Sequence, residues 1–328
     1  MARHGHPATP ATPATPTATP RPTVRATQLT RSGCCGVFAW VDASRLLAYD
    51  TPTSAQSGSW LFDTSGGTPT RVSPEFGPPS PSGIVPISDP AAGVTRLIRL
   101  DGSTVSQIQN GGDPTWVSDD GKRVAWLQPL PGTTPSSLLN RPVRLWVSNI
   151  DGGDARAVID MLAAEVAWLP DNRRVLVAAR ALDTTSPGVW LIDTATGAHQ
   201  VLAAATFVQA VRLSPDGKWF SYLVTFSGNP ARDGVWVGEI DSAVRHHVAG
   251  SAFIRWGPDD QTLWRLDFGV GSSDDQLVSV NLATGAVGRP IDLGGRVLND
   301  DWEVSPNGRS VAYWRESDRN VMLVTPLP

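Results

Sequence analysis

The stretch LSPDGKWFSYL, residues 213–223, decides the fold of this chain. One apolar strand ends at a Ser-Pro-Asp-Gly-Lys turn, and a second apolar strand follows at once. Pro presets φ at the start of such a turn and Gly tolerates a positive φ, so residues in this order form a tight turn. We therefore predict a β-hairpin here.

Turns of the same kind recur along the chain, which identifies a repeat. They are VDASR (41–45), SDDGK (118–122), LPDNR (169–173), SPDGK (214–218), GPDDQ (257–261) and SPNGR (305–309). Third strands are anchored on Trp60, Leu97, Trp146, Trp190, Trp236, Leu277 and Met322, at spacings of 37 to 49 residues. Six of these units continue into a fourth strand. Four strands per unit at this period predict an all-β fold, the β-propeller.

The number of blades depends on the second unit, which has no evident Ser-Pro-Asp-Gly turn unless SDPAAG (88–93) is its remnant. Seven blades are favoured, and six are the alternative. The seventh unit ends before a fourth strand, so we expect TVRATQLTR (23–31) to supply it. This pairing would close the ring and hide two strand edges. The predicted domains are a disordered Pro/Thr/Ala-rich spacer, residues 1–22, and a propeller, residues 23–328.

The repeats resemble those of the TolB-like (PD40, WD40-like) propellers over nearly the whole chain after residue 24. LSPDGKWFSYL and VSPNGRSVAYW (304–314) carry the resemblance best. SGCCGVFAWVDASRLLAYD (32–50) also resembles the first blade of envelope-associated members from bacteria with Pro/Thr-rich stalks. The family implies extracytoplasmic binding or scaffolding more often than catalysis. The second unit, SDDGK and GPDDQ depart from the pattern, which leaves local strand register open there.

Charge and hydropathy along the chain limit the kinds of partner that this protein can be expected to bind. The net charge is −4 and no Lys/Arg cluster forms a stripe, which argues against nucleic acid. No apolar run approaches 18 residues, so no segment is expected to span a membrane. The chain start lacks the apolar region of a signal peptide, yet a Pro/Thr tract suits a stalk. We therefore expect an extracytoplasmic, periplasmic or cell-surface monomer that binds a protein or a glycan.

Tryptophans recur at two positions of the repeat. Trp40, Trp168 and Trp256 stand just before the turn, and Trp60, Trp146, Trp190 and Trp236 stand in third strands. Each buries a large apolar area, so packing between blades is the expected role.

One face of the predicted propeller is the candidate binding face. The loops between second and third strands are long and irregular: 51–58, 129–142, 181–188, 225–234 and 267–275. Irregular loops on a rigid scaffold commonly carry recognition, and we call this the loop-rich face. Inner strands begin at this face, so their first polar residues would ring the channel mouth. The candidate ligand-binding residues there are Asp113, Glu165, Arg212, Arg255, Asp300 and Asp301. Ordered water in the channel is the alternative.

Cys34 and Cys35 are the only cysteines, and they are adjacent. They fall in the link before the first inner strand, on the loop-rich face, and are added to the candidate binding residues. A disulfide between them would form a small ring, for which Gly33 and Gly36 supply backbone freedom. Two buried thiols are the alternative. A zinc site is not expected, because no third Cys and no His lie nearby.

Catalytic motifs are not evident. Neither a Gly-x-Ser-x-Gly elbow nor a His-Glu-x-x-His helix occurs, and no cofactor is expected. The acidic stretches SSDDQ (272–276) and LNDDWE (298–303) are weak Ca²⁺ candidates. The favoured function is non-catalytic binding or scaffolding of a glycan, polymer or protein at the cell envelope. The alternative is a metal-dependent lyase or lactone hydrolase, with Glu165, Asp300 and Asp301 as ligands and Arg255 clamping the substrate.

Overall fold

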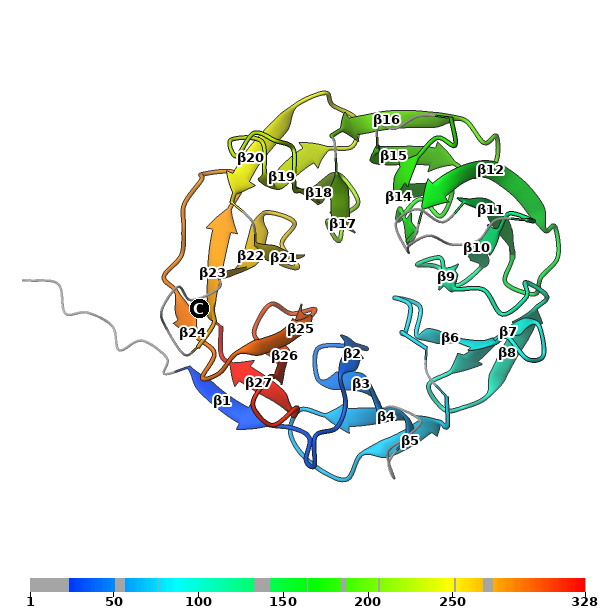
Figure 1. Ribbon diagram of the computed structural model, residues 1–328. Helices are drawn as coiled ribbons and strands as arrows, with labels where there is room; N and C mark the ends of the chain where they lie inside the picture. Colours follow the sequence, from blue (N-terminus) through cyan, green and yellow to red (C-terminus); the bar gives the residue numbers. More distant parts are fainter. Residues whose placement is uncertain are drawn as a thin grey trace, which may run out of the picture.

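The computed structural model describes residues 24–50, 57–75, 77–132, 142–163, 165–183, 187–205, 207–250, 252–267 and 274–327. Every regular element in these ranges is a β-strand, and Figure 1 shows the strands arranged in a ring. The all-β prediction is confirmed. No helix is present in these ranges, and so none that could cross a membrane. The predicted spacer, residues 1–22, lies outside the described residues.

The first two units form separate antiparallel sheets. The first contains β2 (Val37–Trp40), β3 (Arg45–Asp50), β4 (Gly58–Asp63) and β5 (Thr70–Ser73), and the second contains β6 (Ile84–Asp89), β7 (Val94–Arg99) and β8 (Thr104–Ile108).

The second unit does have its turn, although the sequence pattern obscured it. Gly83 donates its backbone N–H to the carbonyl of Ser80, as Gly217 does to Ser214. Ser-Pro-Ser-Gly (80–83) therefore occupies the place of Ser-Pro-Asp-Gly, and SDPAAG (88–93) instead spans the connection from β6 to β7. The unit lacks an inner strand, because residues 77–83 before β6 form no strand.

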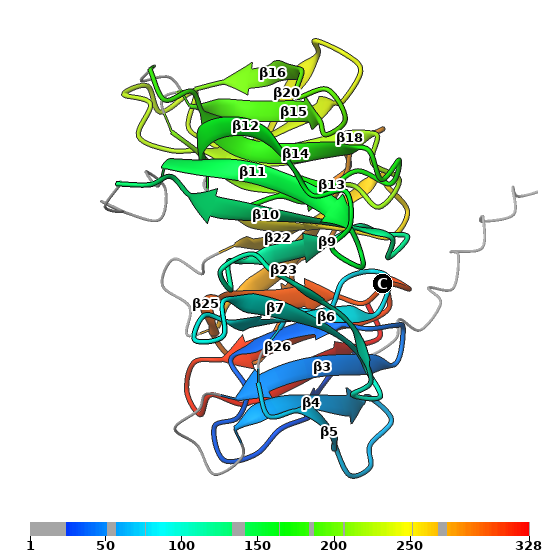
Figure 2. The same cartoon turned by 90° about the vertical axis from the view of Figure 1, so that its right-hand side faces the viewer.

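The third and fourth units share one sheet of eight strands. These are β9 (Thr115–Val117), β10 (Arg123–Pro129), β11 (Pro142–Asn149), β12 (Arg156–Ala163), β13 (Ala167–Trp168), β14 (Arg174–Arg180), β15 (Gly188–Asp193) and β16 (His199–Ala204). The junction consists of two pairs, Leu162 with Arg180 and Ala163 with Ala179. Figure 2 shows these green strands side by side.

The last three units complete the ring. They contain β17 (Val208–Leu213), β18 (Trp219–Val224), β19 (Gly234–Glu239) and β20 (Arg245–Ala249); β21 (Phe253–Trp256), β22 (Thr262–Asp267), β23 (Gln276–Asn281) and β24 (Ile291–Asp292); and β25 (Val297–Val304), β26 (Val311–Arg315) and β27 (Val321–Thr325).

The N-terminal strand closes the ring, as predicted. β1 (Arg25–Gln28) pairs antiparallel with β27, from Arg25 opposite Thr325 to Gln28 opposite Met322. In Figure 1 the blue β1 lies beside the red β27. Within the described residues the strands form six hydrogen-bonded sheets, whereas by repeat unit they fall into seven groups. The difference comes from the fused sheet of the third and fourth units.

The tryptophans before the turns connect neighbouring units. Trp40 donates its indole N–H to the carbonyl of Glu303 at 3.1 Å, and Trp168 donates to the carbonyl of Trp116 at 3.0 Å. Trp256 donates to the Ser221 hydroxyl at 3.1 Å. Each bond runs to the unit before it in the ring. The prediction that these rings pack between units is confirmed.

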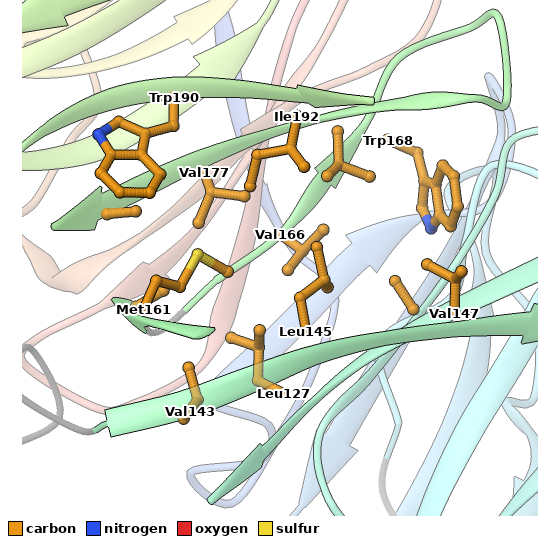
Figure 3. Close-up of a cluster of buried hydrophobic side chains, with 14 residues drawn as sticks. Leu127, Val143, Leu145, Val147, Met161, Val166, Trp168, Val177, Trp190 and Ile192 are labelled. Atoms are coloured by element: carbon orange, nitrogen blue, oxygen red, sulfur yellow. The ribbon is translucent and has the colours of Figure 1, made fainter. Parts of the chain in front are cut away.

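The core consists of apolar layers between successive units, and Figure 3 shows the layer between the third and fourth. Leu145 and Met161 of the third unit pack there with Val177 and Trp190 of the fourth, and all four are buried. Alternate residues of each strand face opposite neighbours, so each unit contributes to two such layers. This packing fixes the inner strands that line the centre of the ring.

Candidate functional site

A pocket lies between the fourth and fifth units, where the inner strand β13 is only two residues long. Leu162 and Ala163 pair with the far end of β14 as the last part of β12, which leaves Ala167 and Trp168 to form β13. Strand alternation directs Leu176, Ala178 and Arg180 of β14 toward β17, on the face opposite to Val177. Between these strands is a cavity of about 710 Å³.

The pocket lining is largely apolar but contains three charged groups. Its polar members are Glu165, Arg180, Arg212 and Gln209. The apolar and aromatic members are Trp116, Leu162, Val166, Ala167, Leu176, Ala178, Ala179, Pro187, Phe207, Val208, Ala210, Val211 and Leu213. Two arginines and one glutamate thus belong to the lining. A mixed lining of this kind suits a ligand that has both an apolar part and a polar group.

The structure brings together Glu165 and Arg212, which were predicted to lie at the channel mouth. Arg212 Nη1 lies 3.8 Å from Glu165 Oε2, and the two side chains are 39% and 69% exposed. An ion pair of this length and exposure contributes little to stability. Both groups therefore remain accessible to a ligand.

A bulge in β17 sets the position of Arg212. The pairing of β17 with β18 shifts between Gln209 and Arg212, where Ala210 has a φ of 51°. This left-handed conformation is uncommon for a residue with a Cβ, and bulges next to binding sites commonly redirect a side chain. Both Gln209 and Arg212 line the pocket.

An exposed aromatic side chain stands next to the pocket. Phe226, in the loop between β18 and β19, is 82% exposed. Its ring meets that of the pocket residue Phe207 edge-on, with the centroids 6.1 Å apart. Leu182, two residues after Arg180, is also exposed. Apolar groups thus continue from the lining onto the loop-rich face.

Arg255, Asp300 and Glu303 form a second polar group on the inner strands. Arg255 donates from Nε to Glu303 at 2.8 Å, from Nη1 to Asp300 Oδ2 at 3.3 Å and from Nη2 to the carbonyl of Asp300 at 2.9 Å. Its guanidinium also lies over the Trp302 ring, 4.9 Å from the centroid. Burial alone would lower the pKa of Arg255, but the two carboxylates raise it overall. Arg255 is therefore held as a cation and has little freedom to reach a ligand.

Asp300 and Asp301 lie on a larger bulge in β25. The pairing with β26 shifts between Val297 and Trp302, and Asn299 and Asp300 have φ values of 55° and 63°. Burial raises the pKa of Asp300, and Arg255 only partly offsets this. Burial and the Asp300 charge raise the pKa of Asp301 to about 7. Among the described residues the Asp301 carboxylate has no hydrogen bond or ion pair.

Asp113 lies in the link before β9, where its backbone makes several contacts. Its carbonyl accepts hydrogen bonds from the Thr95 hydroxyl, the Asn110 amide and the Thr115 hydroxyl, at 3.0 to 3.2 Å. These three side chains are buried, so this part of Asp113 supports the link. A ligand contact through its side chain stays a prediction.

Cys34 and Cys35 form a disulfide bond between adjacent residues. They are 4% and 0% exposed and pack with Leu46 and Phe62 of the first unit and with Ala312 and Val321 of the last. The sulfur atoms thus lie inside the seam between these units rather than on an open rim. A direct ligand contact with them stays a prediction.

Hydrogen bonds explain why the link is folded inward. The Thr30 hydroxyl donates to the carbonyl of Cys34 at 2.6 Å and accepts the N–H of Val321 at 2.8 Å. Gly33, with a φ of 74°, donates its N–H to Asn320. A Cβ at Gly36 would lie 2.7 Å from the Trp314 ring, so close packing requires glycine there.

Carboxylates and other ligating groups do not converge on one point. Among the described residues, no group of three or more His, Cys, Asp or Glu side chains is arranged to hold a metal ion. Glu165, Asp300 and Asp301 accordingly form no such group of metal ligands. The acidic stretch 272–276 lies partly outside the described residues, and Ca²⁺ binding there stays a prediction.

Several residues of this region had no clear signal in the sequence. Arg180, Phe207 and Phe226 join the pocket or its mouth, yet each stands in an ordinary strand end or loop. Only the irregular loop 225–234 pointed to Phe226. The pocket itself depends on the pairing of β12 with β14, which no local pattern shows.

The comparisons with known proteins agree on the fold. No protein-family model and no curated protein sequence matches the chain. An oligogalacturonate lyase in complex with manganese is similar in structure at 13% identity, over 92% of this chain and 93% of that chain, with a TM-score of 0.71. The oligogalacturonate lyase of Vibrio parahaemolyticus is similar at 11% identity, over 92% of this chain and 93% of that chain, with a TM-score of 0.68. The Cps50 (Swd1) β-propeller domain of Myceliophteria thermophila is similar at 8% identity, over 93% of this chain and 100% of that chain, with a TM-score of 0.59.

TolB structures are also among the similar ones, with TM-scores below 0.5. At these sequence identities the likeness shows the fold, and the repeat motifs carry the resemblance to TolB. The closed ring of antiparallel sheets, the Ser-Pro-Asp-Gly turns and the similar structures lead to one conclusion. The chain is a β-propeller, and its turns resemble those of TolB-like repeats.

Proposed function

We propose that this protein is a non-catalytic binding propeller of the cell envelope, which holds a segment of a glycan, polymer or protein partner on its loop-rich face. The pocket between β14 and β17 carries this proposal. Its volume of about 710 Å³ is in the range of ligand sites, and it lies at the junction of two units. The loosely paired Glu165 and Arg212 and the exposed Phe226 give it polar and apolar contacts.

The Cys34–Cys35 disulfide supports the extracytoplasmic part of the proposal. Disulfides persist in oxidising compartments and are rare in the reducing cytosol. The Pro/Thr-rich segment agrees with this location, since it suits a stalk. Oxidation of both cysteines in protein isolated from cells under alkylating conditions is the expected result.

A metal-dependent lyase is the alternative, because an oligogalacturonate lyase with manganese has a similar fold. The three carboxylates that such a site would need here are Glu165, Asp300 and Asp301. They form no ligating group within the described part of the chain, and Arg255 is engaged by Asp300 and Glu303. Both observations favour binding over turnover.

A pocket-filling substitution tests the proposal. Ala178 faces the cavity, so Ala178→Phe places a ring in it, whereas Ala243→Phe adds the same ring on an exposed turn between β19 and β20. The wild-type protein is screened against glycan, polymer and peptide panels by thermal shift, and each hit is titrated with both variants. We expect Ala178→Phe to abolish binding and Ala243→Phe to retain it.

Other outcomes would overturn the proposal. If hits bind Ala178→Phe as tightly as wild type, the pocket is not the site. Oligogalacturonate is also incubated with the protein and Mn²⁺, with and without a chelator. Cleavage that requires the metal and is lost in Glu165→Ala or Asp301→Ala would establish the lyase instead.

A further inference from the structure

The pocket between β14 and β17 and the exposed Phe226 ring beside it form one surface. We propose that this surface holds an uncharged, extended segment of a partner protein, with one apolar side chain in the cavity and a second one against Phe226. This inference rests on the proposed binding function and names the partner class of the same site. Three observations carry it: the balanced charges of the lining, its apolar walls and the way in which Phe226 is held.

The charges of the lining favour a ligand without net charge. Glu165 and Arg212 carry opposite charges 3.8 Å apart, so they compensate each other. Arg180, the third charged member of the lining, already has an interaction of its own. An anion would be attracted by Arg212 and repelled by Glu165, and for a cation the signs are reversed. Neither kind of ion therefore gains from the pair.

The same pair offers hydrogen bonds of both kinds. Its separation of 3.8 Å is longer than a charge-assisted hydrogen bond, which is typically about 2.7 to 2.9 Å, and both side chains are partly exposed. A peptide group has one donor, the N–H, and one acceptor, the C=O. Arg212 can donate to such a carbonyl while Glu165 accepts an N–H. Gln209, which also lines the pocket, can do either.

The walls of the pocket suit an apolar side chain. Ala178 on β14 and Val211 on β17 line the cavity with Trp116 and Phe207, and all four are half-buried, so water reaches part of their apolar surface. Covering such a surface contributes about 25 cal/mol per Å² of apolar area removed from water. A sugar would place hydroxyl groups against these walls without partners, which costs free energy. A peptide segment is therefore favoured over a glycan.

Phe226 is held outward by the structure of its loop. Its side chain is 82% exposed and its φ is 54°, a conformation that is uncommon for a bulky residue. The loop after it is fixed by hydrogen bonds: Ser227 donates its backbone N–H to the Asp233 carboxylate at 2.9 Å, and Arg232 donates its N–H to the carbonyl of Asn229 at 2.8 Å. A ring held in this way provides contact area for a partner at a low cost in conformational entropy.

The distance between the pocket and Phe226 matches the geometry of an extended chain. Side chains two residues apart in a strand point to the same side and lie about 6.6 Å apart. The Phe226 ring is 6.1 Å from the ring of Phe207, which lines the pocket. One side chain of an extended segment can therefore occupy the cavity while the second following one rests on Phe226.

Capped pentapeptides test the partner class by calorimetric titration. The panel is acetyl-Gly-X-Ser-X-Gly-amide, in which X is Val, Leu, Phe or Trp, with a reference peptide in which X is Ser. We expect the best apolar peptide to bind at least about tenfold more tightly than the reference, because it buries apolar surface. If no apolar peptide exceeds the reference, or if tetragalacturonate or maltotetraose binds and no peptide does, the proposal is wrong.

Two further measurements test the absence of a charge requirement. Replacing the terminal amide of the best peptide by a free carboxyl group should change its affinity by less than about threefold. Raising the NaCl concentration from about 0.05 to 0.5 M should change it by less than about twofold, because salt screens attraction between charges. A free acid that binds tenfold more tightly than the amide would overturn the proposal.

The contact with Phe226 is tested by Phe226→Ala, with Val287→Ala as the matched control. Val287 is an exposed apolar residue between β23 and β24, outside the pocket lining. Phe226→Ala should weaken the best peptide about three- to tenfold, and Val287→Ala should leave it unchanged. Both positions are exposed, so unchanged melting curves confirm folding. Equal affinities of the two variants would contradict the second contact.

The hydrogen bond to Glu165 is tested by methylating the peptide nitrogens of the best peptide one at a time. At one position methylation should weaken binding about fivefold, because an N–H donor is lost. In Glu165→Ala the peptide methylated there and its parent should bind alike. A methylation effect of the same size in both proteins would show that Glu165 does not accept this bond.

The two proposals fail in different ways. If Ala178→Phe abolishes binding of a glycan or another ligand while no apolar peptide binds, the pocket is the binding site but the partner class is wrong. If the apolar peptides bind and Ala178→Phe does not affect them, the pocket itself is the wrong site.

Discussion

Arg255 on β21 and Asp300 on β25 face each other across two neighbouring units, with Nη1 and Oδ2 3.3 Å apart and the arginine side chain only 9% exposed. The carbonyl of Asp300 and the Glu303 carboxylate occupy the other donors of the guanidinium. One arginine thus holds a bulged strand whose backbone has two residues in the left-handed region. The role of Arg255 is therefore structural, and its contribution to the free energy of unfolding can be measured.

Removing Arg255 should be costly. Arg255→Ala leaves Asp300 buried without its partner, and breaking a buried ion pair typically costs about 3 to 5 kcal/mol. Urea unfolding measures the loss. Lys218→Ala is the control, because Lys218 forms an exposed pair with Asp216 and should cost less than about 1 kcal/mol. Equal losses in the two variants would contradict the buried role of Arg255.

Asp301 should make stability depend on pH. Its pKa is about 7 in the folded protein and near 3.8 when unfolded, so the folded state retains the proton more strongly. The contribution of protonated Asp301 to the free energy of unfolding is fully present below about pH 4 and is lost as the pH rises to about 7. Asp301→Asn should therefore stabilise the protein above pH 7 by about 1 to 2 kcal/mol, a value reduced for partial solvent screening. Unfolding curves of the wild type and of Asp301→Asn, measured from pH 4 to above pH 7, test this. A difference in the free energy of unfolding that does not change with pH would refute the raised pKa of Asp301.

The disulfide should be protected from reductants in the native protein. Cys34 and Cys35 are almost fully buried in the seam between the first and last units. A phosphine reductant should therefore act slowly until the seam opens, and quickly in concentrated guanidinium chloride. Alkylation followed by mass spectrometry counts the thiols over time. Two alkyl adducts without any reductant would show that the disulfide is absent.

The closing strand should contribute to solubility as well as to stability. Deleting residues 1–28 removes β1 and its four residue pairs with β27. At about 0.5 to 1.5 kcal/mol for each hydrogen bond, a loss of at least about 2 kcal/mol is expected, and the bare edge of β27 should promote aggregation. Deleting residues 1–22 alone should change neither property. Light scattering measures the aggregation of each protein, and thermal unfolding measures its stability. A 29–328 protein that is as stable as the wild type and monomeric would contradict this role of β1.

The fold was accessible from the sequence because its signals are local. A turn such as SPDGK and its apolar flanks specify a hairpin within about ten residues, and the repetition of the hairpin specifies the ring. The second unit was less clear because Ser replaces Asp in Ser-Pro-Ser-Gly (80–83), although its backbone makes the same turn. Closure by residues 25–28 followed from the missing fourth strand of the last unit.

The candidate site could be predicted from the sequence only in part. Inner-strand spacing predicted a set of polar residues at the channel mouth but no pairs among them; the structure pairs Glu165 with Arg212 and Arg255 with Asp300. The depth of the cysteines was not evident, because Asn320 and Val321, which bond to Gly33 and Thr30 and hold the link inward, are remote from it in sequence. The positive φ of Ala210 has no signature in residue type, whereas Asn299 is of a residue type that is enriched in this region.

The short β13 suggests how one member of a repeat family can acquire a ligand site of its own. The pocket lies where β13 is short and the end of β12 pairs with β14 beside it, while the packing layers on both sides are retained. Specificity can therefore diverge through the length of a single strand, without new loops or inserted domains.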